Sequence, residues 1–138
     1  MMEENIRLKH QDITGAILNA FYKRVYAKLG YGFLEKVYEN AMTHELQKSG
    51  LAVVQQQKIE VFYDGKVMGE YFADLVVDNK VIVEIKAVEQ LSHRHEAQLL
   101  NYLRSTQYEV GLLINFGPKA AHCRKAFDNK RKNPSWKP

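Results

Sequence analysis

Residues 72–86, FADLVVDNKVIVEIK, place two acids and a lysine within two runs of aliphatic residues. Asp74 lies in the first run, and Glu84 and Lys86 lie in the second. Two carboxylates that converge on one point repel each other unless a proton or a cation lies between them. Carboxylate oxygens are ligands that suit Mg²⁺ or Mn²⁺, and a neighbouring lysine can neutralise charge or position a water. The stretch therefore indicates a divalent-metal site.

Two strands joined by a tight turn would bring these residues together. Side chains along a strand alternate between its two faces, so Glu84 and Lys86 point the same way. The Asp78-Asn79 turn then allows Asp74 to lie beside Glu84. The alternative is a half-exposed sheet on which both acids face solvent and pair with Lys86.

A further acid, Glu35, lies in the first turn of a helix expected over residues 33–49. At about 100° per residue, Glu35 falls inside the apolar arc of this helix, and Glu39 falls at its margin. A carboxylate on a buried face needs a partner, such as a metal or a basic residue. The alternative for Glu35 is an acid at a helix N-terminus, where the helix dipole stabilises negative charge.

Gln98 and Tyr102 lie four residues apart in a third expected helix, 92–107, and so share one of its faces. Such a pair at the border of a metal site could hold a water or a phosphate. The alternative is a polar pair on the helix surface at the edge of the core.

The remaining elements follow from hydrophobic periodicity and from turn residues. The expected helices cover 12–29, 33–49 and 92–107, and the expected strands cover 53–63, 66–77, 80–88 and 111–116. The order is ααβββαβ. Because the last strand returns after a helix, it pairs with a parallel neighbour, whereas the three preceding strands form a meander. The prediction is an α/β fold in which helices flank a mixed central sheet.

Charge divides the 138 residues into two parts. Residues 1–118, expected to form a single domain, hold 13 Lys/Arg against 15 Asp/Glu, whereas residues 119–138 hold 7 against 1. This basic C-terminal extension, with room for a short edge strand before a flexible tail, could contact a phosphate backbone. A solvated tail without a ligand is the alternative.

The single cysteine, Cys123, excludes an internal disulfide framework and a cysteine-rich zinc site. The N-terminus lacks the apolar core of a secretory signal, and no apolar run is long enough to span a membrane. A cytoplasmic protein without a membrane partner is therefore expected.

Together, these residues resemble the PD-(D/E)XK nuclease superfamily. Asp74 matches its first acid, Glu84-Ile85-Lys86 its (D/E)-x-K element, and Gln98 with Tyr102 its Q-x-x-x-Y element. Ala73 stands where the superfamily name implies a proline. Upstream, GFLEKVY (residues 32–38) resembles the signature of the small GxxExxY protein family within that superfamily.

The resemblance implies a restriction-endonuclease-like core and roles for the site residues. Asp74, Glu84 and the carbonyl of Ile85 would bind Mg²⁺, with Mn²⁺ as a substitute, and Glu35 would be a further ligand. Lys86 would orient the attacking water, and Gln98 with Tyr102 would position the site or the scissile phosphate. The expected chemistry is metal-assisted hydrolysis.

The resulting hypothesis is a metal-dependent nuclease that hydrolyses phosphodiester bonds, acting on DNA in preference to RNA, in repair, recombination or defence. The alternative is a non-catalytic module that keeps the fold and binds nucleic acid or protein. The slightly acidic body of the domain fits poorly with tight DNA binding unaided, and a homodimer or a partner protein could supply further surface.

Overall fold

The computed structural model describes residues 5–133. The N-terminal helical part consists of η1 (Ile6–Leu8), α1 (Gln11–Asn19), the π-helical turn η2 (Ala20–Val25) and α2 (Tyr26–Leu29). Helix α3 spans Glu35–Lys48, α4 spans His93–Arg104, and the short η3 spans Asn129–Arg131. None of the described helices is both long and apolar enough to cross a membrane.

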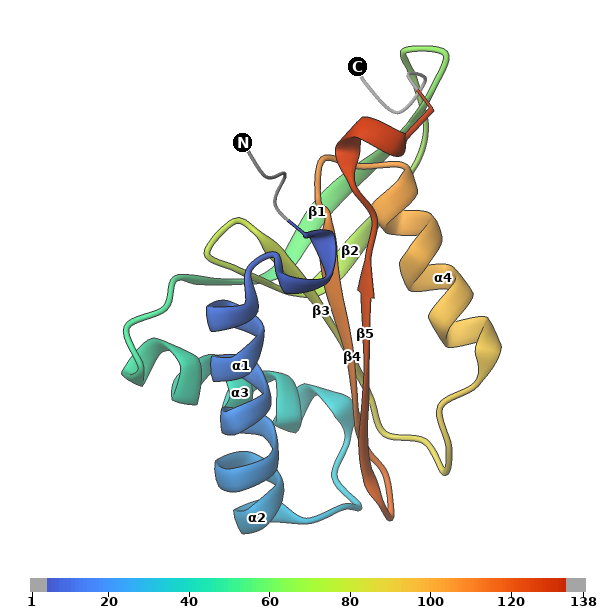
Figure 1. The fold of residues 1–138 in the computed structure, drawn as a ribbon. Helices are drawn as coiled ribbons and strands as arrows, with labels where there is room; N and C mark the ends of the chain where they lie inside the picture. The colour runs from blue at the N-terminus through green and yellow to red at the C-terminus, as the bar shows by residue number, and fades with distance from the viewer. Residues whose placement is uncertain (1–4, 134–138) are drawn as a thin grey trace.

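Five strands form one mixed sheet: β1 (Val53–Tyr63), β2 (Lys66–Val77), β3 (Val81–Lys86), β4 (Val110–Phe116) and β5 (Ala120–Ala126). Their spatial order is the same as their order in the chain. All neighbours are antiparallel except β3 and β4, which are parallel. Helix α4 makes the crossover that a parallel pair requires, and it lies on the opposite side of the sheet from α1 and α3 (Figure 1).

The sheet separates two hydrophobic cores. One core packs the aliphatic side chains of β3 and β4 against α1, η2 and α3, with Phe21, Tyr38 and Phe116 among its largest members. The other packs Leu99 and Leu103 of α4 against the opposite face of the sheet. Strand β4 is buried at every position, because helices cover both faces of the sheet at its centre.

The predicted α/β class and the order of the helices and strands are confirmed. Strands β1 and β2 have the predicted bounds, whereas β3 ends at Lys86, before the predicted end at residue 88. The first predicted helix contains the π-helical turn η2 and ends at Gly30, whose φ of 63° continues no right-handed helix.

Strand β5 comes after the last element of the predicted order ααβββαβ. It pairs with β4 along its whole length. It therefore forms an edge of the sheet within residues 119–138, the predicted basic extension. The last residues of the predicted flexible tail, 134–138, lie outside the described residues.

The β1–β2 hairpin extends beyond the rest of the sheet. Strand β2 pairs with β1 from Tyr63↔Lys66 to Val53↔Val77, but it pairs with β3 only from Leu75↔Val83 to Val77↔Val81. The far part of the hairpin therefore projects from the body of the molecule, close to the C-terminal end of α4 and to η3 (Figure 1).

Candidate metal and phosphodiesterase site

The pairing of β2 with β3 stops next to the two sheet acids. The ladder ends at Leu75↔Val83, so Asp74 and Glu84 occupy the following positions, where the two strands separate. Asp74 Oδ2 accepts a hydrogen bond of 2.7 Å from the backbone N–H of Ile85. The carboxylate thus pairs with a strand N–H at the position where the ladder stops, and this contact fixes Asp74 against the (D/E)-x-K segment.

Glu84 carries the most perturbed carboxyl group of the site. Burial raises its pKa, and repulsion from Asp74 raises it further, to about 8, although Lys86 acts in the opposite direction. Its Oε1 is buried and has no hydrogen-bond partner among the described residues. A buried carboxylate without a partner is costly when it is ionised, so this oxygen needs a proton, a water or a cation.

Lys86 lies on the same face of β3 as Glu84 and is half-buried. Within residues 5–133, its ammonium group makes no hydrogen bond and no ion pair. An ammonium group beside two carboxylates that is not engaged in a salt bridge can interact with a water or with a substrate oxygen.

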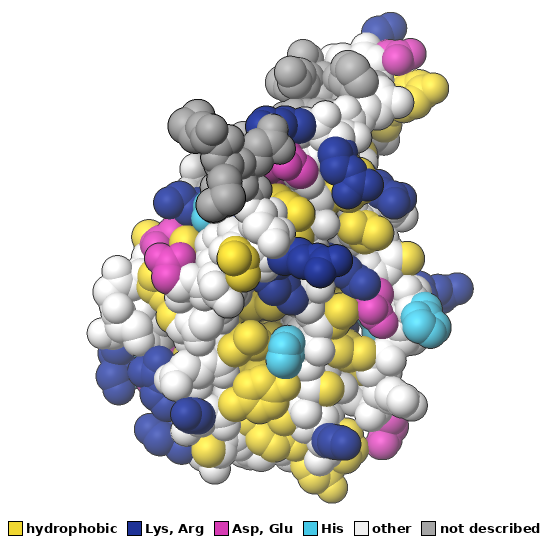
Figure 2. All heavy atoms as spheres, in the orientation of Figure 1, with side chains coloured by type: hydrophobic (Ala, Val, Ile, Leu, Met, Phe, Trp, Pro, Cys, Tyr) yellow, Lys and Arg dark blue, Asp and Glu magenta, His cyan; other side chains and the backbone are white. Residues whose placement is uncertain are grey.

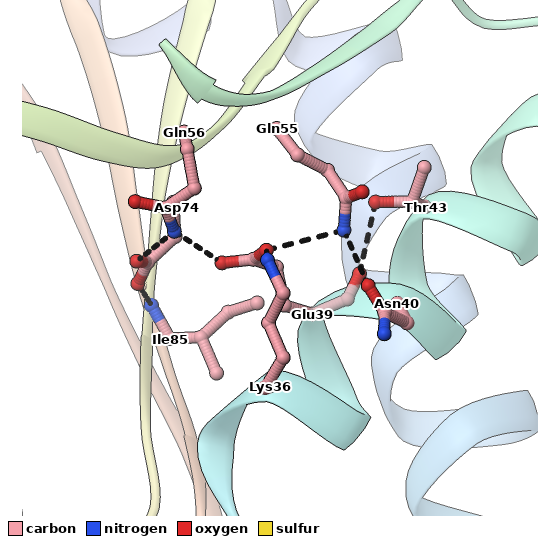
Figure 3. A network of polar contacts seen from close by, with 8 residues as sticks. All are labelled: Lys36, Glu39, Asn40, Thr43, Gln55, Gln56, Asp74 and Ile85. Carbon is pink, nitrogen blue, oxygen red and sulfur yellow. Dashed lines mark hydrogen bonds and ion pairs between the residues drawn. The ribbon is translucent and has the colours of Figure 1, made fainter. Parts of the chain in front are cut away.

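Gln56 joins the sheet acid to an acid of α3. Its Nε2 lies 3.3 Å from Asp74 Oδ1 and 2.5 Å from Glu39 Oε1 (Figure 3). Gln56 has a φ of 53°, an uncommon conformation for a non-glycine residue. Val53 packs on the α3 side of the sheet and Ile59 on the α4 side, so β1 changes its orientation around Gln56.

Glu39 is 3% exposed, and neighbouring donor groups compensate the negative charge of its carboxylate. Lys36 Nζ lies 2.5 Å from Glu39 Oε2, and Gln55 Nε2 lies 3.2 Å from the same oxygen. Figure 3 shows these donors converging on Glu39 from α3 and β1. Glu39 therefore belongs to a polar network that reaches Asp74 through one amide group.

The predicted burial of two of the three acids of α3 is wrong. Glu35, expected on the buried face, is exposed, and Glu39, expected at the margin, is buried. On a helical wheel the apolar arc includes Leu34 and Val37, but these side chains are 81% and 40% exposed, because the N-terminal turn of α3 lies outside the core.

Glu35 nevertheless reaches the segment that follows Lys86. Its Oε2 accepts a hydrogen bond of 3.1 Å from the backbone N–H of Ala87. The next residue, Val88, is held by Asn115, which accepts from its N–H at 3.0 Å and donates to its carbonyl at 2.9 Å. A Cβ atom at Gly117 would lie 2.0 Å from the Val88 carbonyl oxygen, so this close approach requires glycine.

Helix α4 contributes Tyr102, which stacks on Tyr71 of β2 with a centroid distance of 3.5 Å and an interplanar angle of 9°. Burial and repulsion from Glu84 raise the pKa of Tyr102, and a hydrogen bond with Gln98 opposes the shift. Burial, followed by repulsion from Glu84, also raises the pKa of Tyr71, and the Tyr71 hydroxyl is buried without a hydrogen-bond partner in the described part of the chain. Both rings thus border Glu84.

The structure brings five predicted site residues to one region: Asp74, Glu84, Lys86, Gln98 and Tyr102. Glu35 is connected to this region by its hydrogen bond with the N–H of Ala87. Sequence reasoning missed Gln56, Tyr71 and Asn115 and ranked Glu39 too low. Two signals were present in the sequence: the polar run Gln55–Gln57 inside a strand, and a lone asparagine in the apolar run GLLINFG.

The donor atoms at this point fit a metal ion that keeps part of its hydration shell. No group of three or more Asp, Glu, His or Cys side chains that could hold a metal occurs within residues 5–133. A site built on Asp74 and Glu84 would therefore use two carboxylates, with backbone oxygen and water as the remaining ligands, which is the usual way in which proteins bind Mg²⁺. The unpartnered Glu84 oxygen fits such a ligand set.

The fold and these residues define a nuclease-type α/β domain. Residues 11–126 match the family model of the PD-(D/E)XK nuclease superfamily, and the chain belongs to this superfamily. Its members act on nucleic acids, and they generally use divalent metal ions.

Comparison with solved structures finds chains that resemble this one at low sequence identity, and two of them illustrate the likeness. One is the crystal structure of SSO0001, with 19% identity, a TM-score of 0.49 and coverage of 93% of this chain and 72% of that chain. The other is an alkaline exonuclease from Laribacter hongkongensis, with 10% identity, a TM-score of 0.48 and coverage of 88% and 73%. No curated protein matches the sequence.

Proposed function

We propose that this protein is a Mg²⁺-dependent nuclease that hydrolyses phosphodiester bonds in DNA. The observation that carries the proposal is the Asp74–Glu84 pair, in which a buried Glu84 oxygen lacks a partner among residues 5–133 while the ammonium group of Lys86 is not held in a salt bridge there. Two carboxylates and one lysine at the point where two strands separate are suited to hydrolysis at a phosphorus centre.

Asp74, Glu84 and the carbonyl oxygen of Ile85 are the proposed ligands of Mg²⁺, for which Mn²⁺ can substitute. When bound, the cation supplies Lewis acidity and lowers the pKa of a bound water. The N–H of Ile85 orients the Asp74 carboxylate at 2.7 Å. Ile85 would therefore position the site twice, through its N–H, which holds Asp74, and through its carbonyl oxygen, which would bind the cation. Glu84 must lose its proton before it can bind the cation.

Lys86 is proposed to orient the attacking water and to stabilise the charge that develops on the phosphoryl oxygens. Gln98 and Tyr102 are proposed to position the scissile phosphate from α4. Glu35 is proposed to act on the metal or on its water. Its hydrogen bond to the N–H of Ala87 supports this role, because it holds the Glu35 carboxylate next to the Lys86 backbone.

We also propose membership in the GxxExxY family within the superfamily, on the basis of Gly32, Glu35 and Tyr38. The Tyr38 hydroxyl donates to the Gly30 carbonyl at 2.8 Å and accepts from the Phe33 N–H at 3.2 Å. This tyrosine therefore fixes the loop that leads into α3, and the loop in turn places Glu35. Two residues of the signature are thus linked, because Tyr38 fixes the loop that places Glu35.

The test is cleavage of single-stranded, duplex and branched DNA, and of RNA, by purified protein with Mg²⁺ or Mn²⁺. Lys86→Ala and Asp74→Ala proteins, purified in parallel, are the controls. We expect metal-dependent cleavage by the wild type alone. Equal cleavage by all three proteins would assign the activity to a contaminant. No cleavage by the wild type, with no Mg²⁺ binding in calorimetry, would instead favour a non-catalytic module that binds nucleic acid or protein.

A further inference from the structure

Several basic side chains lie at the projecting end of the molecule. A hollow of about 400 Å³ opens between the β1–β2 hairpin, the end of α4 and the segment after β5. Its lining includes three basic and three aromatic side chains and no acidic one: Arg104, Arg131, Lys132, Phe62, Tyr63 and Phe127. Figure 2 shows Lys and Arg side chains at this end of the face that it presents, and also at the middle and the lower left of that face. We call this hollow the hairpin pocket.

Phe127 organises the two arginines of the hairpin pocket. The guanidinium carbons of Arg104 and Arg131 both lie 5.2 Å from the centroid of its ring. Each contact is a cation–π interaction, worth about 0.5–1 kcal/mol at an exposed site. The ring therefore holds two like charges close together, although these charges repel each other.

Neither arginine is neutralised by an acid within residues 5–133. Two acids, Asp128 and Glu109, act electrostatically on Lys132 of this pocket. Asp128 caps η3 by accepting from the Lys130 N–H at 2.9 Å, and Glu109 pairs with Lys9 at 2.8 Å. Within the part of the chain that the structure describes, two exposed guanidinium groups without a carboxylate partner offer paired N–H donors, which is the arrangement that suits a phosphate.

Lys132 anchors the segment that carries Arg131. It is 7% exposed, and its Nζ donates to the carbonyls of Thr106 and Tyr108, both at 2.7 Å. Because both acceptors lie just after α4, the lysine ties the C-terminal segment to the α4–β4 connection. Arg131 is therefore presented by an anchored segment, which favours a built binding site.

The aromatic side chains suit a single strand better than a duplex. Tyr63, at the end of β1, is 59% exposed beside the hollow. An exposed ring next to cationic groups can stack on an unpaired base while the cations bind the backbone. In a duplex, the faces of the bases are already stacked on their neighbours.

We infer that the hairpin pocket binds the phosphate backbone of a single-stranded nucleic acid whose other part reaches the Asp74–Glu84 site. The identity of the ligand rests on the proposed nuclease function. Along β1, the run from Gln56, which contacts Asp74, to Phe62 spans about 20 Å at the usual strand rise. A strand that keeps the ~3.4 Å spacing of a stacked duplex strand would cross this distance in about six nucleotides, and an extended single strand would need fewer. Tyr71, which stacks on Tyr102, pairs with Ile59 and so lies between the two regions.

The test compares two double substitutions that remove the same charge. Arg104→Ala/Arg131→Ala alters the hairpin pocket, whereas Lys23→Ala/Lys28→Ala removes two exposed lysines from η2 and α2, at the other end of the molecule (Figure 1). Binding of a fluorescein-labelled dT20 strand, and of rU20 in parallel, is measured by anisotropy in EDTA, where the metal-dependent reaction cannot occur. Thermal melting verifies the fold, and R104Q/R131Q repeats the test with a smaller change in volume.

We expect R104A/R131A to weaken dT20 binding at least about tenfold at 0.1 M salt and to lower the salt slope by about 1.4, since each contact with a single strand contributes ~0.7. K23A/K28A should stay within about twofold of the wild type. Equal losses in the two double variants, or no loss in either, would overturn the inference. Loss with dT20 alone, and not with rU20, would assign the pocket to DNA, and equal loss would assign it to the shared phosphate chemistry.

Binding in EDTA keeps this inference separable from the nuclease proposal. If the wild type binds dT20 through the two arginines but cleaves nothing with Mg²⁺, the hairpin pocket stands and the nuclease proposal fails. If cleavage occurs, R104A/R131A should raise KM for dT20 and leave KM for dT2 unchanged, because a dinucleotide is too short to reach the hairpin pocket even when it is extended. An equal rise for both lengths would contradict the link between the two regions.

Discussion

The Asp74 carboxylate accepts a hydrogen bond of 2.7 Å from the backbone N–H of Ile85, immediately beyond the last β2–β3 pair, Leu75↔Val83. A side chain here takes over a contact that strand pairing would otherwise make. Asp74 is therefore both a structural acceptor and a proposed metal ligand, and these two roles can be separated by mutation.

Asp74→Ala removes the acceptor and the charge, whereas Asp74→Asn keeps an oxygen that can accept from Ile85. In EDTA, we expect Asp74→Ala to lower the free energy of unfolding by about 1.5–3 kcal/mol, the usual range for a hydrogen bond to a charged group. Asp74→Asn should stay within about 1 kcal/mol of the wild type. Both should lose stabilisation by Mg²⁺. Urea unfolding with and without Mg²⁺ measures each quantity, and equal destabilisation by the two substitutions would contradict the structural role.

The Glu84 carboxyl makes the stability of the metal-free protein depend on pH. Its pKa rises from 4.5 to about 8 on folding, so between these values the folded state binds more protons than the unfolded chain. Stability from this group is therefore highest at low pH and falls as the pH rises toward 8. Glu84→Gln removes the dependence.

In EDTA, the melting temperature of Glu84→Gln should exceed that of the wild type by a margin that grows from pH 5 to pH 8, reaching several degrees, about 3–5 °C for each kcal/mol. Mg²⁺ should raise the melting temperature of the wild type but not of the variant. A constant difference across this pH range would show that Glu84 keeps its ordinary pKa.

Lys86→Ala should reduce cleavage by about 10²–10³-fold, because it removes a group that stabilises charge in the transition state. Affinity for Mg²⁺ should change by less than about tenfold, since an ammonium group is not a metal ligand. Single-turnover cleavage and calorimetry measure the two effects. Lys80→Ala, which changes an exposed lysine just before β3, is the matched control and should cleave at the wild-type rate.

Asn115→Ala should destabilise the protein by about 2–4 kcal/mol. Asn115 is 1% exposed, and its loss leaves both backbone groups of Val88 without their contacts of 3.0 and 2.9 Å. Asn40→Ala, at an exposed asparagine that accepts from Gln55, should cost less than about 0.5 kcal/mol. Chemical denaturation of both variants measures the difference, and similar values would mean that the Val88 clamp contributes little.

The strands of the hairpin could be predicted to the residue because two local signals agree there. Alternation of polar and apolar residues sets the strand period, and Asp64-Gly65 supplies two residues that adopt positive φ, at 54° and 71°. The (D/E)-x-K segment could also be predicted from the sequence, because charged residues are unusual within aliphatic runs.

The polar network around Glu39 could not be predicted in the same way. A helical wheel gives relative angles but not the direction in which the helix packs, so the exposure of Leu34 misled the interpretation of Glu35. The role of Gln56 depends on its φ of 53°, which no propensity would assign to a glutamine within a strand. Contacts between α3 and β1 are tertiary, and they appear only once the helix is placed on the sheet.

The Asn115 clamp links the proposed site to the completion of folding. It joins β4 to the residues that follow Lys86, although the parallel β3–β4 pair forms only after α4 has crossed the sheet. During synthesis, the hairpin with Asp74 can form while the Lys86 segment still lacks its anchor. We therefore expect the proposed site to be completed at a late step, and a local opening of β4 to disrupt it while the β1–β2 hairpin remains intact.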